Sequence, residues 1–272
     1  MAKPLIILDS GHNEYVGGKE APDKSMREWE FNNDMQNRIK KRLKALGFDV
    51  FLTNPSPAKK NEIGLAKRAQ LANNEWARKG KPQAVFVSLH ANAYGAWTTA
   101  NGVEVFHAKS CSQASKKYAK IMCDNIHATL KKLRPGSVNR GVKAENFTVI
   151  YKANMPSILI EYAFYTNKQD LVVLKNNRAE LAEATVKALC QCFNMPYKAA
   201  SAEPKQEPFL VKVIYSGKEG LNIRKQANTS SAIVGQVFEG QVFTILEVVN
   251  GMGKLKSGVG WISLGAKYVK RV

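Results

Sequence analysis

The sequence has no long hydrophobic run. Its 272 residues contain no stretch of about 18 consecutive apolar residues, the length that a membrane-spanning helix requires. The first residues, MAKPLIILDSGH, turn polar too soon for the hydrophobic core of a secretory signal peptide. We therefore expect no stable membrane insertion, and we expect the chain to start in the cytosol.

Cysteine and histidine are both scarce, with four residues of each. The cysteines Cys111, Cys123, Cys190 and Cys192 form no CxxC pair, which argues against a thiolate zinc site. We expect four free thiols that pack as small hydrophobic side chains. Any imidazole chemistry must come from the four histidines.

Acidic residues are few, with 22 Asp and Glu against 41 Lys and Arg, for a formal net charge of +19. Such a chain is attracted to polyanions, which include nucleic acids, anionic membranes and acidic cell-wall polymers. The sequence lacks a basic helix with base-reading spacing and an aromatic RNA-binding pattern. The net charge alone does not identify which polyanion the protein binds, and no motif in the sequence favours nucleic acid.

Short apolar segments alternate with longer amphipathic ones over the first 195 residues. The expected strands are 5–8, 48–52, 84–89, 103–106, 147–151 and 157–160, and the expected helices are about 26–46, 62–79, 112–133 and 168–193. This alternation predicts an α/β domain over 1–195, with a mostly parallel central sheet flanked by helices.

The composition changes after residue 195. Residues 196–208 carry three prolines among small and charged residues, which is typical of a linker. Residues 209–272 consist of short strand-like pieces separated by glycines, without helical periodicity. We expect a small all-β barrel there. It is also basic, with nine Lys or Arg against three acids.

Two histidines stand at the ends of predicted strands. ILDSGHN places His12 shortly after the first strand, and VSLHANA places His90 at the end of another. The carboxyl ends of parallel strands share one edge of a sheet, where ligands bind. The two imidazoles are therefore expected to converge there, although two unrelated loop histidines remain the alternative.

A third ligand for a metal held by two histidines would be anionic. Glu28 lies within the apolar stripe of the helix predicted from about residue 26, where a carboxylate is costly unless it is paired or bound to a cation. Alternatively, Ser25 and Glu28 form a helix-capping box. Glu14 and Glu20 are further candidate ligands on the intervening loop.

Glu161 follows four apolar strand residues in SILIEYAFYTN. An acidic residue that interrupts a buried strand is seldom there for packing alone. At the same sheet edge, its carboxylate can act as a general base toward water. The alternative is an ion pair with a nearby Lys or Arg.

The ordered series ILDSGHN, REWEFNN, VSLHANA, NRGVK and ILIEYAFYTN resembles the motifs of the zinc-dependent N-acetylmuramoyl-L-alanine amidases over roughly residues 4–193. The resemblance implies a Zn²⁺ cofactor held by His12, Glu28 and His90, with Glu161 as the catalytic residue. It also places Asn92 and Arg140 at the substrate.

The C-terminal segment, with its Leu-Asn-Ile-Arg start and its Gly-Trp-Ile, resembles a bacterial SH3-type domain. This resemblance implies that residues 209–272 form an SH3-like barrel that binds the cell wall. Tyr215, Trp261 and Tyr268 are the candidate contacts, and a place in the core is the alternative for Trp261.

Together the two resemblances imply a peptidoglycan hydrolase that cuts the amide between N-acetylmuramic acid and L-alanine. Its partners would be peptidoglycan and anionic wall polymers. We expect a phage endolysin that stays in the cytoplasm of the host bacterium until release and then acts on the wall. The alternatives are a host autolysin, a sporulation amidase, a zinc peptidase of the stem peptide, and a catalytically dead wall-binding protein.

Overall fold

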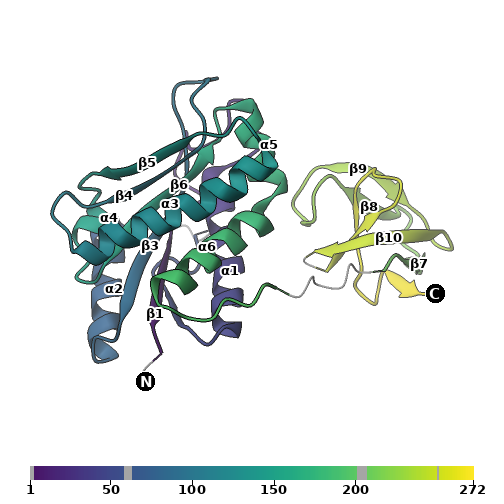
Figure 1. Ribbon diagram of the computed structural model, residues 1–272. Helices are drawn as coiled ribbons and strands as arrows, with labels where there is room; N and C mark the ends of the chain where they lie inside the picture. Colours follow the sequence, from purple (N-terminus) through teal and green to yellow (C-terminus); the bar gives the residue numbers. More distant parts are fainter. Residues whose placement is uncertain (1–2, 58–62, 201–206, 250) are drawn as a thin grey trace. The chain divides into compact units, whose positions relative to one another are not determined.

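The computed structural model describes residues 3–57, 63–200, 207–249 and 251–272 (Figure 1). The chain divides into two compact units, Met1–Ala199 and Ala200–Val272. Of the expected linker 196–208, residues 201–206 lie outside the described residues. No helix within the described ranges is both long and apolar enough to cross a membrane.

The N-terminal unit is built on a six-stranded sheet with the strand order β2-β1-β3-β6-β4-β5. Its strands are β1 Leu5–Ser10, β2 Asp49–Leu52, β3 Ala84–Asn92, β4 Val103–His107, β5 Asn139–Ala144 and β6 Ser157–Phe164. All neighbouring strands are parallel except β4 and β6, which run antiparallel. The predicted α/β class with a mostly parallel sheet is confirmed.

Helices cover both faces of this sheet (Figure 1). They are α1 Glu28–Ala45, α2 Leu65–Arg78, α3 Gln113–Leu133, α4 Thr148–Tyr151, α5 Lys168–Asn176 and α6 Arg178–Cys192. Side chains alternate along each strand, so Ile6 and Leu8 of β1 pack with α1, α3 and α6, while Leu5 and Ile7 pack with α2 and α4. Two apolar layers explain why the central strands are continuous hydrophobic runs.

The prediction of a strand at 147–151 is wrong. Val149 and Ile150 are buried there, but from the short helix α4. The strand of this region is β5, an edge strand whose residues are exposed or half-buried, so its sequence NRGVKA carries no apolar pattern. A four-residue apolar run cannot distinguish a strand from a helical turn.

The predicted helix 168–193 is two helices, α5 and α6, which meet at Asn177. The backbone of Asn177 has left the helical region, with φ −122° and ψ 34°. The free state expected for all four cysteines is confirmed, and Cys123, Cys190 and Cys192 are buried.

The C-terminal unit is an all-antiparallel sheet with the order β13-β7-β10-β11-β12-β8-β9. Its strands are β7 Phe209–Val213, β8 Leu221–Arg224, β9 Ile233–Val237, β10 Val242–Val249, β11 Met252–Leu255, β12 Trp261–Ser263 and β13 Val269–Arg271. Its inward-facing side chains, Val211, Val213, Ile245 and Ile262 among them, form a core of their own. This confirms the small SH3-like β fold.

A buried ion pair fixes the end of β1. Arg68 of α2 is 1% exposed and Asp9 is fully buried, with Arg68 Nη1 3.3 Å from Asp9 Oδ2. The same carboxylate accepts hydrogen bonds from Thr53 Oγ1 at 2.6 Å and Ser88 Oγ at 2.8 Å, which lie on the segments beside β1. Asp9 therefore holds the segment that leads into His12.

Removing the cation of this pair should destabilise the protein strongly. Arg68→Ala leaves the Asp9 carboxylate buried without its counter-ion, and we expect a loss of about 3–5 kcal/mol in the free energy of unfolding. Arg38→Ala, which removes an exposed pair with Asp34 on α1, should lose less than about 1 kcal/mol. Urea denaturation of both variants measures the difference, and equal losses would contradict the role given to Asp9.

Candidate active site

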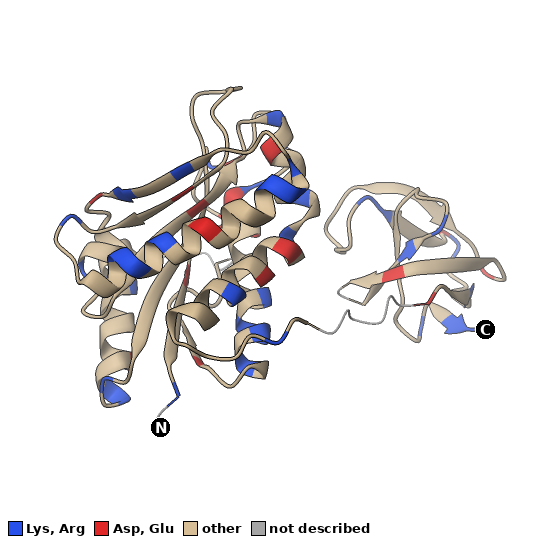
Figure 2. Cartoon of the chain, in the orientation of Figure 1, with Lys and Arg blue, Asp and Glu red and all other residues tan. Residues whose placement is uncertain are grey.

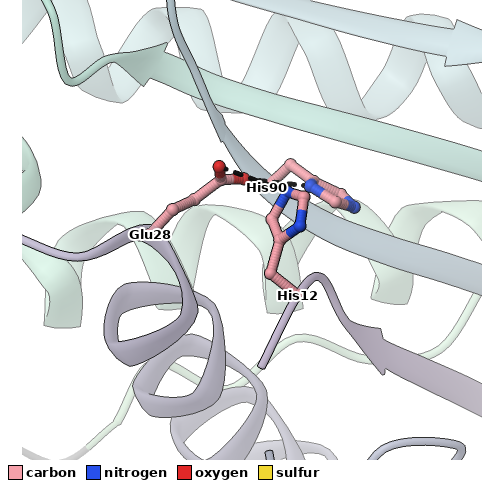
Figure 3. Close-up of side chains that lie close together, drawn as sticks. All are labelled: His12, Glu28 and His90. Carbon is pink, nitrogen blue, oxygen red and sulfur yellow. Dashed lines mark hydrogen bonds and ion pairs between the residues drawn. The ribbon is translucent and has the colours of Figure 1, made fainter. Parts of the chain in front are cut away.

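Three side chains from different elements meet at the carboxyl edge of the sheet (Figure 3). His12 follows β1, His90 lies near the end of β3, and Glu28 is the first residue of α1. His12 has a left-handed backbone with φ 61°, which is uncommon outside glycine. Asn54 holds this turn, because its Nδ2 donates to the carbonyls of Ser10 and His12 at 2.9 and 3.0 Å.

Glu28 bridges the two imidazoles. Glu28 Oε2 lies 3.3 Å from His12 Nε2, and Glu28 Oε1 lies 3.0 Å from His90 Nδ1. The rings meet edge-on, with centroids 5.1 Å apart. The two histidines that the sequence places at separate strand ends do converge.

Glu28 is 3% exposed, and its surroundings hold it as an anion. Burial opposes its ionisation, but the hydrogen bonds and charges of His12 and His90 outweigh burial and lower the pKa of Glu28 to about 2. The Ala91 amide and Asn32 Nδ2 also donate to Glu28 Oε1, at 3.3 and 3.4 Å.

The capping-box alternative for Glu28 is wrong. The helix begins at Glu28 itself, its N-cap is Arg27, and no side chain caps it. Ser25 lies outside the helix, where its amide donates to Asp23 Oδ1 at 3.0 Å. Glu28 is therefore free to turn toward the strand ends.

These three residues suit a metal ion. One ligand atom of each lies within 4.8 Å of the other two, and across the described ranges no other trio of His, Cys, Asp or Glu is so arranged. Two imidazole nitrogens and one carboxylate oxygen are a donor set found in zinc sites with an open position. Glu14 and Glu20, the other candidate ligands, do not belong to the cluster.

Glu161 lies beside the cluster on the next strand. It is in register with His90 across the parallel pair β3–β6, so both side chains leave the sheet on the same face. Glu161 Oε2 is shielded from solvent and has no hydrogen-bond partner among the described residues, although the residue as a whole is partly exposed. Glu161 forms no ion pair with a Lys or Arg in the described part of the chain, which argues against the ion-pair alternative for this residue.

The electrostatic environment of Glu161 is opposite to that of Glu28. Burial raises the pKa of Glu161 well above its ordinary value, and the charges of Glu28 and Glu104 raise it further. Lys19 lowers this pKa by less than these contributions raise it. The site therefore combines a carboxylate that stays ionised with one that readily takes up a proton, as general acid–base chemistry requires.

Asn92 and Arg140, predicted at the substrate, converge on Glu104 of β4. Asn92 Nδ2 donates to Glu104 Oε1 at 2.6 Å, Arg140 Nε donates to Glu104 Oε2 at 2.7 Å, and Lys143 also donates to Oε2. Burial opposes ionisation of Glu104, but these hydrogen bonds lower its pKa below the ordinary value. Glu104 is in register with Glu161 across β4–β6.

Sequence reasoning missed Glu104, although the signal was available. GVEVF interrupts an apolar strand with an acid in the same way as the segment around Glu161.

Sequence reasoning also did not identify Gly11 as a residue that shapes the site. A Cβ on Gly11 would lie 2.1 Å from Cε1 of His90, so only glycine leaves room for that imidazole.

In the C-terminal unit, two of the three candidate wall contacts lie together. Tyr215 and Tyr268 pack edge-to-face with centroids 5.5 Å apart, both half-buried against the core. Trp261 on β12 is half-buried but is not part of the core cluster, and Lys254 Nζ lies 5.7 Å from its ring centroid. Their contact with a ligand stays a prediction.

Comparison with known sequences assigns both units. Residues 6–191 match the family described as N-acetylmuramoyl-L-alanine amidase. The chain belongs to this amidase family. Residues 219–270 match the bacterial SH3 domain, so an amidase domain is followed by an SH3-type domain.

The amidase chain is similar to an endolysin of Bacillus phage SPP1, with 28% identity over 286 residues that cover 97% of each chain. It is also 32% identical to the N-acetylmuramoyl-L-alanine amidase LytC of Bacillus subtilis over 173 residues. That match covers 62% of the present chain but only 31% of LytC. The similarity thus extends over almost the whole length of the phage protein and over about a third of the bacterial one.

Solved structures confirm the fold of the amidase domain. A crystal structure of an N-acetylmuramoyl-L-alanine amidase from Clostridium difficile 630 superposes with a TM-score of 0.62 and 27% identity, over 71% of this chain and 97% of that one. The catalytic domain of CwlV from Paenibacillus polymyxa gives a TM-score of 0.61 at 24% identity, covering 71% of this chain and 99% of that one.

Gly11→Ala should disturb the candidate metal site without replacing His12, Glu28 or His90. The added methyl displaces the His90 imidazole, and we expect affinity for a divalent ion, measured with Zn²⁺ as the probe, to weaken roughly 10- to 100-fold. Gly17→Ala is the matched control on the same loop, because nothing lies within 4 Å of its added Cβ. If the two variants bound Zn²⁺ equally well, the packing of Gly11 against His90 would not matter for the site.

Proposed function

We propose that the chain is a zinc-dependent N-acetylmuramoyl-L-alanine amidase that hydrolyses the amide bond between N-acetylmuramic acid and L-alanine in peptidoglycan. Membership of the amidase family supports the reaction class. The observation that carries the proposal is the cluster of His12, Glu28 and His90 with Glu161 in register beside it.

His12, Glu28 and His90 are the proposed ligands. Their donor atoms already point toward one another, and the anionic Glu28 partly balances the charge of a divalent ion. When bound, Zn²⁺ supplies a Lewis acid that polarises the scissile carbonyl and acidifies water.

Glu161 is the proposed general base and acid. Its carboxylate takes the proton from the attacking water, holds it, and passes it to the nitrogen of L-alanine as the amide bond breaks. The raised pKa of Glu161 suits this intermediate storage of a proton. No donor among the described residues bonds to its Oε2, so no neighbouring hydrogen bond competes with the transferred proton.

Asn92 and Arg140 are proposed to contact the substrate. Glu104 fixes both side chains from the strand next to Glu161, which aims an amide and a guanidinium at the same edge of the sheet. Those groups can bind carbonyl and carboxylate oxygens of a peptide.

The proposed domain division is an amidase domain over 1–195, a linker over 196–208 and a wall-binding domain over 209–272. Tyr215, Trp261 and Tyr268 are the proposed wall contacts in the last domain. Lys and Arg side chains are spread over both units (Figure 2), which favours encounter with anionic wall polymers.

An endolysin is the favoured biological setting. The phage relative aligns along almost its whole length, whereas LytC has a further two thirds that this chain does not match. A host autolysin or sporulation amidase is therefore the second candidate. A dead wall-binding protein is disfavoured because the donor cluster and Glu161 are both in place.

Product analysis with and without a chelator tests the reaction. Purified peptidoglycan digested by the zinc-loaded protein should release intact stem peptides with a free L-alanine amino group, identified by mass spectrometry. Dialysis against a chelator should abolish release, and added Zn²⁺ should restore it. Fragments cut within the stem peptide would instead identify a peptidase.

Glu161→Gln should separate activity from stability. Loss of the carboxylate should lower turnover by about 10²- to 10⁴-fold while Zn²⁺ still binds. Because the raised pKa makes the folded state bind a proton more readily than the unfolded state, ionisation of Glu161 destabilises the metal-free protein as pH rises above about 4.3. The uncharged Gln side chain does not ionise, so the variant does not lose this stability as pH rises.

We therefore expect metal-free Glu161→Gln to unfold at a higher temperature than metal-free wild type at pH 7, with the difference vanishing at low pH. Calorimetry at several pH values measures this. Glu180→Gln, which neutralises an exposed carboxylate in the first turn of α6, should leave activity unchanged and lower the free energy of unfolding by less than about 1 kcal/mol. A Glu161→Gln variant with normal turnover would overturn the assigned mechanism.

A further inference from the structure

The loop between β3 and β4 presents aromatic side chains from a fixed backbone. The Tyr94 amide donates to Thr166 Oγ1 at 3.0 Å, the Thr98 amide donates to the Thr166 carbonyl at 3.0 Å, and Asn167 Nδ2 donates to the Thr98 carbonyl at 3.1 Å. Trp97 nevertheless remains 43% exposed. A large aromatic side chain that stays exposed to solvent on a loop fixed by hydrogen bonds is characteristic of a binding surface.

Two hollows adjoin at Trp97. One has a volume of about 440 Å³ and the other about 240 Å³, and both are lined by Trp97 and Lys168. Thr98, Thr99, Asn167 and Gln169 line the first hollow, and Asp23 and Asn176 are among the residues that line the second. We call this surface the Trp97 shelf.

The Trp97 shelf belongs to the same loops as the metal cluster. Asp23 lies on the segment that joins His12 to Glu28, and Trp97 lies seven residues after His90 on the segment that leaves β3. A ligand that occupies the shelf therefore contacts the segment that joins His12 to Glu28 and the segment that follows the strand of His90.

Two of the three cations that line the Trp97 shelf have acidic neighbours, and the third, Lys168, forms no ion pair among the described residues. Arg134 is paired with Asp170, and Lys175 is close enough to Asp23 to lower its pKa, after the larger effect of hydrogen bonds from Ser25. Lys168 Nζ lies 5.5 Å from the centroid of the Trp97 ring. Besides these charges, the surface offers an aromatic ring, hydroxyl and amide groups, and the apolar side chains of Leu171 and Val172.

We propose that the Trp97 shelf binds the glycan strand of peptidoglycan next to the cleaved muramoyl unit. This inference rests on the proposed function and adds a subsite to it. The apolar face of a sugar ring stacks on Trp97, while its hydroxyl and N-acetyl groups meet the polar side chains of the two hollows.

The shelf fits a glycan better than a stem peptide. Two adjoining hollows that share the Trp97 ring offer room for more than one sugar ring. Of the three cations that line the hollows, Arg134 and Lys175 have acidic neighbours and Lys168 lies near the Trp97 ring. A peptide carboxylate would therefore find a single available cation, Lys168, whereas the hydroxyl and amide groups of a sugar find several polar partners.

The test compares Trp97→Ala and Trp97→Phe in the zinc-loaded full chain. Peptide-free glycan strands and free stem peptide are titrated calorimetrically, and kcat/KM is measured on polymeric peptidoglycan and on a muramoyl dipeptide without neighbouring sugars. We expect Trp97→Ala to weaken glycan binding and to lower the preference for polymer over fragment, each by about tenfold. Trp97→Phe should lose less, because it keeps a ring.

Tyr151→Ala is the matched control, since Tyr151 is an exposed aromatic residue on α4 outside both hollows. The proposal is overturned if Trp97→Ala binds glycan strands and selects polymer as wild type does. It is equally overturned if stem-peptide binding falls and glycan binding does not. A wild-type protein that cleaves neither substrate would refute the proposed function, while the glycan titration would still decide on the shelf.

Discussion

The hydrogen bonds from two imidazoles to the buried Glu28 carboxylate are the interaction on which the candidate site at the sheet edge depends. A buried carboxylate is costly unless hydrogen-bond donors or cations surround it. Here the donors come from the ends of β1 and β3, and the acceptor comes from the first turn of α1. The free-energy cost of burying the Glu28 carboxylate is offset when β1, β3 and α1 bring both imidazoles to it. Misplacing any of these elements would leave a buried charge with fewer hydrogen-bond donors, so the buried charge favours this one arrangement of the three elements.

Glu161 and Glu104 show how neighbouring strands give one residue type two roles. They face each other in register across β4 and β6, yet Glu104 has three hydrogen-bond donors while Glu161 Oε2 has no partner among the described residues. Their pKa values accordingly move in opposite directions. Glu104 organises cationic and amide groups, and the proton-exchange role that we propose for Glu161 uses its raised pKa.

Strand-end chemistry made much of this site predictable from sequence. His12, His90 and Glu161 follow apolar runs, and parallel strands bring such positions to one edge. Glu28 was detectable as an acid on an apolar helix face, although its helix starts later than a capping box at Ser25 would require.

The remaining features depend on tertiary contacts that no local pattern encodes. Strand β5 was not predicted because an exposed edge strand needs no apolar alternation. Helix α4 was predicted as a strand because its four residues are too few to show a helical period. Gly11 is required because the His90 ring packs against the Gly11 Cα, and this contact is visible only in the folded structure.

The reversed direction of β4 has a consequence for how such enzymes diversify. In a parallel pair, the chain must cross the sheet through a helix before the next strand begins. Because β4 runs antiparallel to β6, the segment from Asn92 to Val103 leaves and re-enters the sheet at the edge that holds the histidines. Insertions or deletions in that segment would change the surface beside the two histidines while leaving every crossover helix intact, which makes it a natural place for related domains to differ in length and surface.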